Sequence, residues 1–209
     1  MKLTWYDAKQ PVATLVLAHG AGAGQKSAWM VKTAQALAER GITVATFDFP
    51  YMSAGRSVPD KAPVLEAAWR VAFDEATAAK EVRNNRSGRV FIGGKSMGGR
   101  IATHIAAQGV EHLAGVVLLG YPLHPSGQPG KRRDAHLPQI KEPVLFVQGS
   151  SDTFGTADEI KALLPSMPKA TLHVIEGGDH SFKVKGGAAK VAAAFDEVIA
   201  TVDFWVRQH

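Results

Sequence analysis

The segment Gly94-Lys95-Ser96-Met97-Gly98 places a glycine two positions to either side of a serine. It follows a short apolar run and precedes a segment of helical period, so it predicts a strand-to-helix turn. Such a turn strains the backbone at the serine and exposes its hydroxyl, and the glycines let neighbouring backbone pass closely. The pattern therefore predicts that Ser96 is a nucleophile. The alternative is that Ser96 only caps the following helix.

A serine nucleophile needs a base within hydrogen-bond reach and an acid that orients the base. His180 directly follows the last predicted strand, and Asp152 lies in the turn after the strand before it. The order serine, acid, histidine is the one expected for this motif. We therefore predict a catalytic triad of Ser96, Asp152 and His180. Asp179 is the alternative acid, although an adjacent residue rarely points its carboxylate at the neighbouring ring.

A glycine-rich segment, His19-Gly20-Ala21-Gly22-Ala23-Gly24, lies at the end of the predicted strand Thr14–His19. In a serine hydrolase, a loop at this place presents a backbone N–H toward the nucleophile as half of an oxyanion hole. We expect Ala21 to supply it, with Gly22 as the next choice. The residue after the nucleophile, Met97, is expected to supply the other half.

Each of the two glycine motifs also resembles a nucleotide-binding pattern, but the sequence lacks one glycine that each of these patterns requires. A phosphate-binding loop ending at Lys95-Ser96 requires glycine at position 89, where the chain has Arg89. A dinucleotide fingerprint in the first cluster requires glycine at position 25 or 27, where the chain has Gln25 and Ser27. We therefore expect no nucleotide cofactor.

The elements that must position these residues show a βαβ rhythm. Short runs rich in valine, isoleucine, leucine and phenylalanine alternate with longer stretches of helical period. The runs are continuously apolar, which is typical of parallel strands covered by helices on both faces. The predicted strands are Thr14–His19, Thr43–Phe49, Val90–Gly94, Gly115–Tyr121, Val144–Gly149 and Thr171–Glu176, with a possible edge strand at Lys2–Tyr6.

Three amphipathic helices are expected between and after these strands. One begins at Ser27 and stops at Gly41, since glycine is favoured just beyond a helix end. The others carry apolar stripes over residues 65–76 and 191–206. We expect the aromatic side chains of these stripes, Trp29 and Phe195 included, to lie in the core rather than at a ligand.

Composition indicates one soluble globular domain over residues 1–209, because 45% of the 209 residues are hydrophobic. The absence of cysteine excludes thiol nucleophiles, disulfides and cysteine-based metal sites, and no metal or cofactor is expected. The N-terminus lacks an apolar signal region and no run spans a membrane, so we expect a cytoplasmic protein. The net charge of +5 is scattered, which argues against a nucleic-acid partner.

With these motifs in order, the sequence resembles the α/β-hydrolase superfamily over nearly its whole length. The motifs are also similar to those of a small dienelactone-hydrolase-like group, which includes the hydrolase-like domain of a chromatin-complex subunit and a testis-expressed protein. This resemblance implies a three-layer α/β-hydrolase fold and the same triad. Dienelactone hydrolases proper use cysteine where this chain has Ser96, so lactone specificity does not carry over. The segments that carry the group resemblance are residues 19–23, 93–100, 121–125 and 179–182.

The chain departs from the fuller fold in two ways. Few residues precede the predicted strand Thr14–His19, so we expect six to seven strands. Only about twenty residues separate Tyr121 from Val144, too few for a substantial lid, and we expect an open site.

We expect a serine hydrolase, carboxylesterase-like or thioesterase-like, that cleaves small-molecule esters or thioesters of small acyl groups. Candidate substrate contacts are Gly22, Tyr121 and Arg132. Arg132 lies in the basic run Lys131-Arg132-Arg133, which either holds an anionic group of the substrate or is a solvated turn. The alternative is a non-catalytic interaction module, since fold alone does not establish function. The oligomeric state is not indicated.

Overall fold

The computed structural model describes residues 2–79 and 88–209. Their strands form one seven-stranded sheet in the order β1-β3-β2-β4-β5-β6-β7. Strand β1 is antiparallel to β3, and every other pair is parallel. The prediction of a mostly parallel sheet of six to seven strands is therefore confirmed. The strands are β1 (Thr4–Tyr6), β2 (Ala13–Ala18), β3 (Ile42–Phe47), β4 (Val90–Lys95), β5 (Leu113–Leu119), β6 (Val144–Gly149) and β7 (Ala170–Ile175).

The predicted strand ends differ from the observed ones by two residues at most. The two-residue differences at the carboxyl ends of β3 and β5 have a simple cause: apolar character continues past the end of the hydrogen-bonded ladder. Phe49 and Tyr121 follow β3 and β5 and are buried, although neither belongs to a strand. Hydrophobicity therefore locates the buried segment, and backbone pairing decides where the strand stops.

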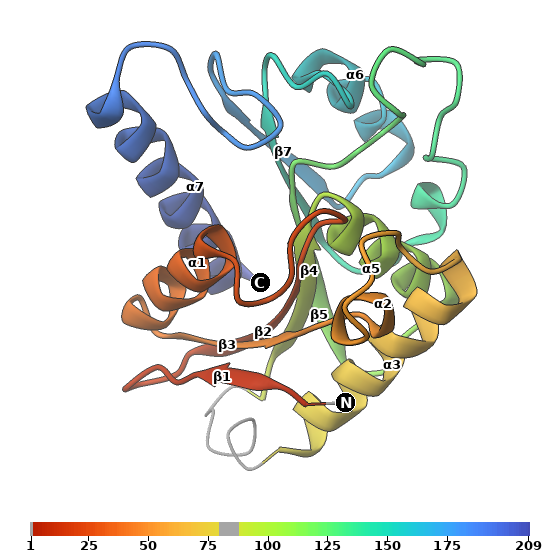
Figure 1. Cartoon of the computed structure of the whole chain (residues 1–209), viewed down its shortest axis with the longest axis vertical. Coiled ribbons are helices and arrows are strands. Elements are labelled where there is room, and N and C mark those ends of the chain that lie inside the picture. Colours follow the sequence, from red (N-terminus) through yellow and green to blue (C-terminus); the bar gives the residue numbers. More distant parts are fainter. Residues whose placement is uncertain (1, 80–87) are drawn as a thin grey trace.

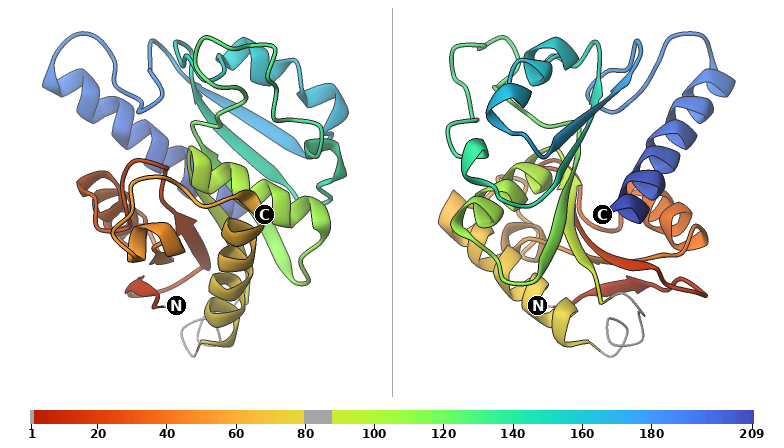
Figure 2. Two further views of the ribbon diagram at one scale, coloured as in Figure 1. Left: turned by 45° about the vertical axis from the view of Figure 1, so that its right-hand side comes forward. Right: turned by 180° about the vertical axis from the view of Figure 1, so that it is seen from behind.

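Helices cover both faces of the sheet, which gives three layers (Figures 1 and 2). Alternate residues of each strand face opposite layers: in β4, Ile92 packs on one side and Phe91 on the other. Both layers are apolar, which explains why the strands read as continuous apolar runs. One face carries α1 (Ala28–Glu39) and α7 (Ala188–Gln208), the other carries α3 (Ala62–Ala78) and α5 (Met97–Gln108), and α2 (Pro50–Ser53) and α6 (Ala157–Lys161) are short.

The boundaries predicted for the first long helix are confirmed. Ser27 is the N-cap residue of α1, and the helix ends at Glu39 with Arg40 as its C-cap. Gly41 follows with a φ of +91°, a conformation that favours glycine. The loop from β2 to α1 is thereby confined to residues 19–27, so the glycine-rich segment must lie at the carboxyl edge of the sheet.

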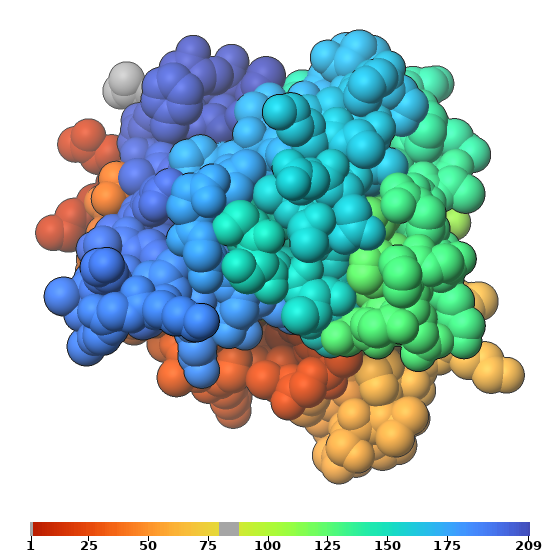
Figure 3. All heavy atoms as spheres, turned by 90° about the horizontal axis from the view of Figure 1, so that it is seen from above, coloured from red at the N-terminus to blue at the C-terminus, as the bar shows by residue number. Residues whose placement is uncertain are grey.

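No substantial lid covers that edge. The chain between β5 and β6 contains one short 3₁₀ helix, Leu137–Gln139, and otherwise runs as loop. In the view from above, this loop, the segment after β6 and the segment before α7 lie side by side as one surface (Figure 3). Within residues 2–79 and 88–209, no helix is long and apolar enough to cross a membrane.

Candidate active site

Ser96 lies at a sharp turn between β4 and α5. Its backbone has a φ of 52° and a ψ of −119°, a strained conformation for a residue with a side chain. The flanking glycines make the turn possible: a Cβ on Gly94 would lie 2.7 Å from the Ala18 carbonyl oxygen, and one on Gly98 would lie 2.6 Å from it. The predicted strand-to-helix turn is therefore present, and it presents the Ser96 hydroxyl at the carboxyl edge of the sheet.

The structure brings the three predicted triad residues together. The Ser96 hydroxyl donates to Nε2 of His180 over 2.8 Å, and Nδ1–H of His180 donates to Oδ2 of Asp152 over 2.7 Å. Asp152 is fully buried, whereas the His180 side chain is 21% exposed. The Phe154 ring lies 4.4 Å from the His180 ring, centroid to centroid, and limits its movement.

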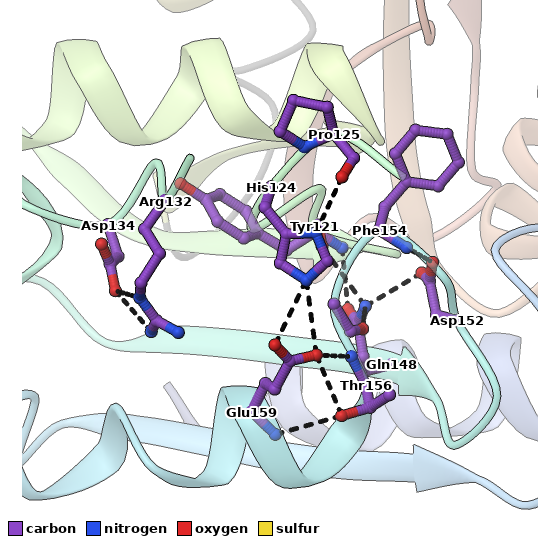
Figure 4. A network of polar contacts seen from close by, with 11 residues as sticks. Tyr121, His124, Pro125, Arg132, Asp134, Gln148, Asp152, Phe154, Thr156 and Glu159 are labelled. Carbon is purple, nitrogen blue, oxygen red and sulfur yellow. Dashed lines mark hydrogen bonds and ion pairs between the residues drawn. The ribbon is translucent and has the colours of Figure 1, made fainter. Parts of the chain in front are cut away.

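The acid is held by groups that sequence analysis did not identify (Figure 4). Oδ1 of Asp152 accepts the N–H of Phe154 over 2.8 Å, and Oδ2 accepts an amide N–H of Gln148 over 2.9 Å. Gln148 is fully buried and also bonds to the Gly155 carbonyl and to the backbone of Tyr121. A glutamine at the end of the otherwise apolar strand β6 is the one sequence signal that marks this role.

The alternative acid, Asp179, lies elsewhere. Its carboxylate is exposed, and Oδ1 accepts the backbone N–H groups of Ser181 over 2.7 Å and of Lys183 over 2.9 Å. These bonds close the turn that carries His180. Asp179 therefore shapes the loop, and Asp152 is the carboxylate that contacts the imidazole.

The residues expected to supply the oxyanion hole border the candidate nucleophile. Ala21 and Gly22 line the same pocket as Ser96, and Met97 is the first residue of α5, whose N–H has no acceptor within the helix. The hydroxyl of Tyr51 donates to the Ala21 carbonyl over 2.9 Å and fixes the peptide that joins Ala21 to Gly22. Burial raises the pKa of Tyr51 to about 12, so the hydroxyl keeps its proton.

A pocket of about 800 Å³ opens beside Ser96 and His180. Its walls come from the glycine-rich loop, α1 and the first half of α7, and they include Trp29, Val191 and Phe195. Trp29 and Phe195, which were expected to lie in the core, pack against it while only partly buried, and they also line this pocket. Both residues are on apolar helix faces, but near the sheet edge these faces reach beyond the strands and border the pocket. A larger hollow of about 1010 Å³ lies at Tyr6, Gly41 and Arg207 and contains no triad residue.

Two expected substrate contacts, Tyr121 and Arg132, are not among the residues that line the pocket beside Ser96. Tyr121 is buried, and its hydroxyl donates to the Arg133 carbonyl over 2.6 Å. Arg132 is exposed and pairs with Asp134, with an N–O distance of 2.6 Å (Figure 4). Of the three expected contacts, only Gly22 lies at the pocket.

Several solved structures share the fold. Est1E from Butyrivibrio proteoclasticus, solved with ferulic acid, is 14% identical with a TM-score of 0.75, and the match covers 96% of this chain and 93% of that one. Dienelactone hydrolase from Anabaena variabilis is 20% identical with a TM-score of 0.73, covering 99% and 91%. XC6422 from Xanthomonas campestris, described as a serine hydrolase without lid, is 18% identical with a TM-score of 0.70, covering 97% and 88%.

Residues 11–206 match the model of a family described as "Alpha/beta hydrolase domain". The match spans all the parallel strands and the three candidate triad residues. The seven-stranded sheet, the helices on both faces and the absence of a large lid agree with it. The chain therefore belongs to the alpha/beta hydrolase family.

Proposed function

We propose that the protein is a serine hydrolase that cleaves carboxylic esters or thioesters through an acyl-serine intermediate. One observation carries the proposal: a strained, pocket-lining serine hydroxyl bonds to an imidazole whose other nitrogen bonds to a buried carboxylate. A serine, a histidine and an acid in this relation form a nucleophile, a general base and a group that orients the base.

In the proposed reaction, Ser96 Oγ attacks the acyl carbon while Nε2 of His180 takes the hydroxyl proton. The carbon–oxygen or carbon–sulfur bond then breaks, and the imidazolium returns the proton to the leaving alcohol or thiol. In the second half, water attacks the acyl carbon while the same imidazole takes a proton from it. The bond to Ser96 Oγ then breaks, the imidazolium returns the proton to Ser96, and the carboxylic acid leaves. Asp152 stays ionised throughout and keeps the proton of neutral His180 on Nδ1.

The negative charge that develops on the carbonyl oxygen needs donors that are already in place. The N–H groups of Met97 and Ala21 are proposed for this role, because Met97 directly follows Ser96 in the chain and Ala21 lines the same pocket as Ser96. Removing one donor of this kind costs about 3 to 4 kcal/mol of transition-state stabilisation.

The acyl group is proposed to occupy the pocket between α1 and α7. Sequence analysis expected small acyl groups and an open site. The apolar side chains of Trp29, Val191 and Phe195 nevertheless give the site an apolar wall. Each methylene that contacts such a wall gains about 0.8 kcal/mol, so the pocket suits acyl groups longer than acetyl.

The proposal is tested by measuring the hydrolysis of p-nitrophenyl esters and matching thioesters with acetyl, butyryl, hexanoyl and octanoyl groups. The Ser96→Ala variant is the blank for each substrate. We expect turnover that Ser96→Ala and His180→Ala each abolish, and a double variant hardly worse than either, since nucleophile and base act as a unit. Additive losses, or turnover that survives in Ser96→Ala, would contradict the proposal, and a folded protein without any turnover would favour the interaction module.

A further inference from the structure

The pocket beside Ser96 has an unusual charge pattern. Among the residues that the structure describes, its lining contains three lysines, Lys32, Lys95 and Lys183, but no aspartate or glutamate. The walls between them are mostly apolar. A pocket of this composition attracts a ligand that is itself apolar and negatively charged.

Lys95 is the most enclosed of the three cations. Its ammonium donates to the carbonyl oxygen of His180 and lies 5.4 Å from the ring centroid of Phe182 and 6.0 Å from that of Trp29. Among residues 2–79 and 88–209, no carboxylate lies within ion-pair distance of it, and no second acceptor is in hydrogen-bond contact. Two of its three N–H groups are therefore left without a protein partner.

An ammonium in such surroundings is energetically costly. Burial lowers the pKa of Lys95 to about 8, against a smaller opposite effect of the charges on Asp152 and Asp179. At neutral pH the side chain is still mostly charged. Because a buried cation is unfavourable unless it is paired, an anion that enters the pocket removes part of this cost.

Lys32 and Lys183 extend the positive charge toward solvent. Both are exposed, and the ammonium of Lys32 lies 3.9 Å from the ring centroid of Phe195 on the opposite wall. A substrate that approaches the pocket therefore passes cations before it reaches Lys95, which directly precedes the nucleophile Ser96 in the chain.

We propose that the pocket selects acyl groups with an apolar body and a carboxylate, so that the preferred substrates are half-esters or half-thioesters of dicarboxylic acids. This inference rests on the function proposed above and adds the substrate class. Lys95 is the specificity-determining residue, and Lys32 and Lys183 contribute charge at the mouth. Sequence analysis left open whether Arg132 binds an anionic group of the substrate; we assign anion binding to these lysines instead, because Arg132 is paired with Asp134 outside the pocket.

The test compares two esters of equal chain length, p-nitrophenyl hexanoate and the mono-p-nitrophenyl ester of adipic acid. The measured quantity is the ratio of kcat/KM for adipoyl over hexanoyl, after subtraction of the Ser96→Ala rate for each ester. Since Lys95 also contacts His180, Lys95→Met is expected to slow both substrates, but a shared loss cancels in the ratio. Lys32→Met and Lys183→Met are exposed variants that test the same ratio, and Lys131→Met, in the basic run outside the pocket, is the matched control.

We expect the wild-type ratio of kcat/KM, adipoyl over hexanoyl, to be about ten or more. A hydrogen bond to a charged group gives an effect of this size. Lys95→Met should bring the ratio close to one, Lys32→Met and Lys183→Met should lower it in part, and Lys131→Met should leave it unchanged. A wild-type ratio of one or less, a ratio that survives Lys95→Met, or a ratio that Lys131→Met abolishes overturns the substrate class. If neither ester is cleaved in a Ser96-dependent way, the proposed hydrolase function itself fails.

Discussion

At the scale of single residues, the reactivity proposed for Ser96 depends on two side chains that do not line the pocket. Asp152 accepts the Nδ1–H of His180, and Gln148 holds Asp152 from behind. The proximity of Ser96, Asp152 and His180 was predictable, because these residue types follow predicted strands in the order that a catalytic triad requires. Gln148 was not, since its role depends on which buried groups meet after folding.

We expect Asp152→Asn to slow turnover on the order of 10⁴-fold, because an amide favours the wrong imidazole tautomer. Asp179→Asn is the matched variant, since asparagine retains an oxygen that can accept the two backbone N–H groups of the turn. Asp179→Asn should reduce turnover far less than Asp152→Asn does. A larger loss of kcat in Asp179→Asn than in Asp152→Asn would show that the acid has been assigned wrongly.

Gln148→Met tests the support of the acid. Methionine fills a similar volume but cannot bond to Asp152, to the Gly155 carbonyl or to the backbone of Tyr121. We expect a loss of stability of about 1 to 3 kcal/mol from the unsatisfied buried groups, measured by urea unfolding. We also expect kcat to fall with little change in KM, assayed well below the unfolding transition. If Gln148→Met loses stability but keeps the wild-type kcat, Gln148 has only a structural role.

At the scale of elements, the site depends on how closely the turn at Ser96 approaches strand β2. Gly98 lies in the first turn of α5, with the carbonyl oxygens of Ala18 and His19 packed against it. The indole N–H of Trp69 donates to the Gly98 carbonyl over 3.1 Å. These contacts fix the start of the helix and thereby the position of the Ser96 hydroxyl.

Gly98→Ala should therefore destabilise the protein by about 1 to 3 kcal/mol, since the added methyl group cannot be placed without moving backbone. It should also lower kcat, because the movement occurs two residues from Ser96. Gly130→Ala is the control: a Cβ there meets nothing within 4 Å, and its effect should be within experimental error. Equal unfolding midpoints for the two variants in urea would contradict the packing that we describe.

The elements also show what the sequence could and could not predict. The strands were predictable because burial on both faces leaves continuous apolar runs. The pocket could not be predicted, because helical periodicity identifies the apolar face of a helix but does not show where the sheet beneath that face ends. Met30 on α1 is buried against the sheet and borders the pocket, whereas its neighbour Trp29 and Phe195 on α7 are only partly buried there.

At the scale of the whole molecule, stability responds to pH through groups far from the pocket. His136, in the connection between β5 and β6, bonds to the Thr103 hydroxyl over 2.8 Å and packs on His104, with ring centroids 4.5 Å apart. Burial, together with the charges of His104 and Arg100, lowers the pKa of His136 to about 4.

Acid should therefore destabilise the fold below pH 6.5. The unfolded chain protonates this imidazole near its ordinary pKa of 6.5, whereas the folded chain resists protonation until about pH 4. Stability contributed by neutral His136 is present above pH 6.5 and falls as the pH drops, by about 1 kcal/mol at pH 5 once solvent screening of this partly exposed group is allowed for. His136→Gln should flatten the dependence of unfolding free energy on pH between 7 and 5, and His209→Gln at the exposed C-terminus should not. The same slope in all three proteins would contradict this account.

The measurement that tests the central claim most directly is covalent labelling of the native protein with a fluorophosphonate probe, followed by intact-mass analysis and peptide mapping. Ser96 Oγ should displace fluoride and form one phosphonate ester per chain. The adduct should map to Ser96, be absent from Ser96→Ala, and form far more slowly in His180→Ala, although each variant keeps the wild-type circular dichroism spectrum. A folded wild-type protein that is never labelled, or a label that maps to another residue, would contradict the claim that Ser96 is an activated nucleophile.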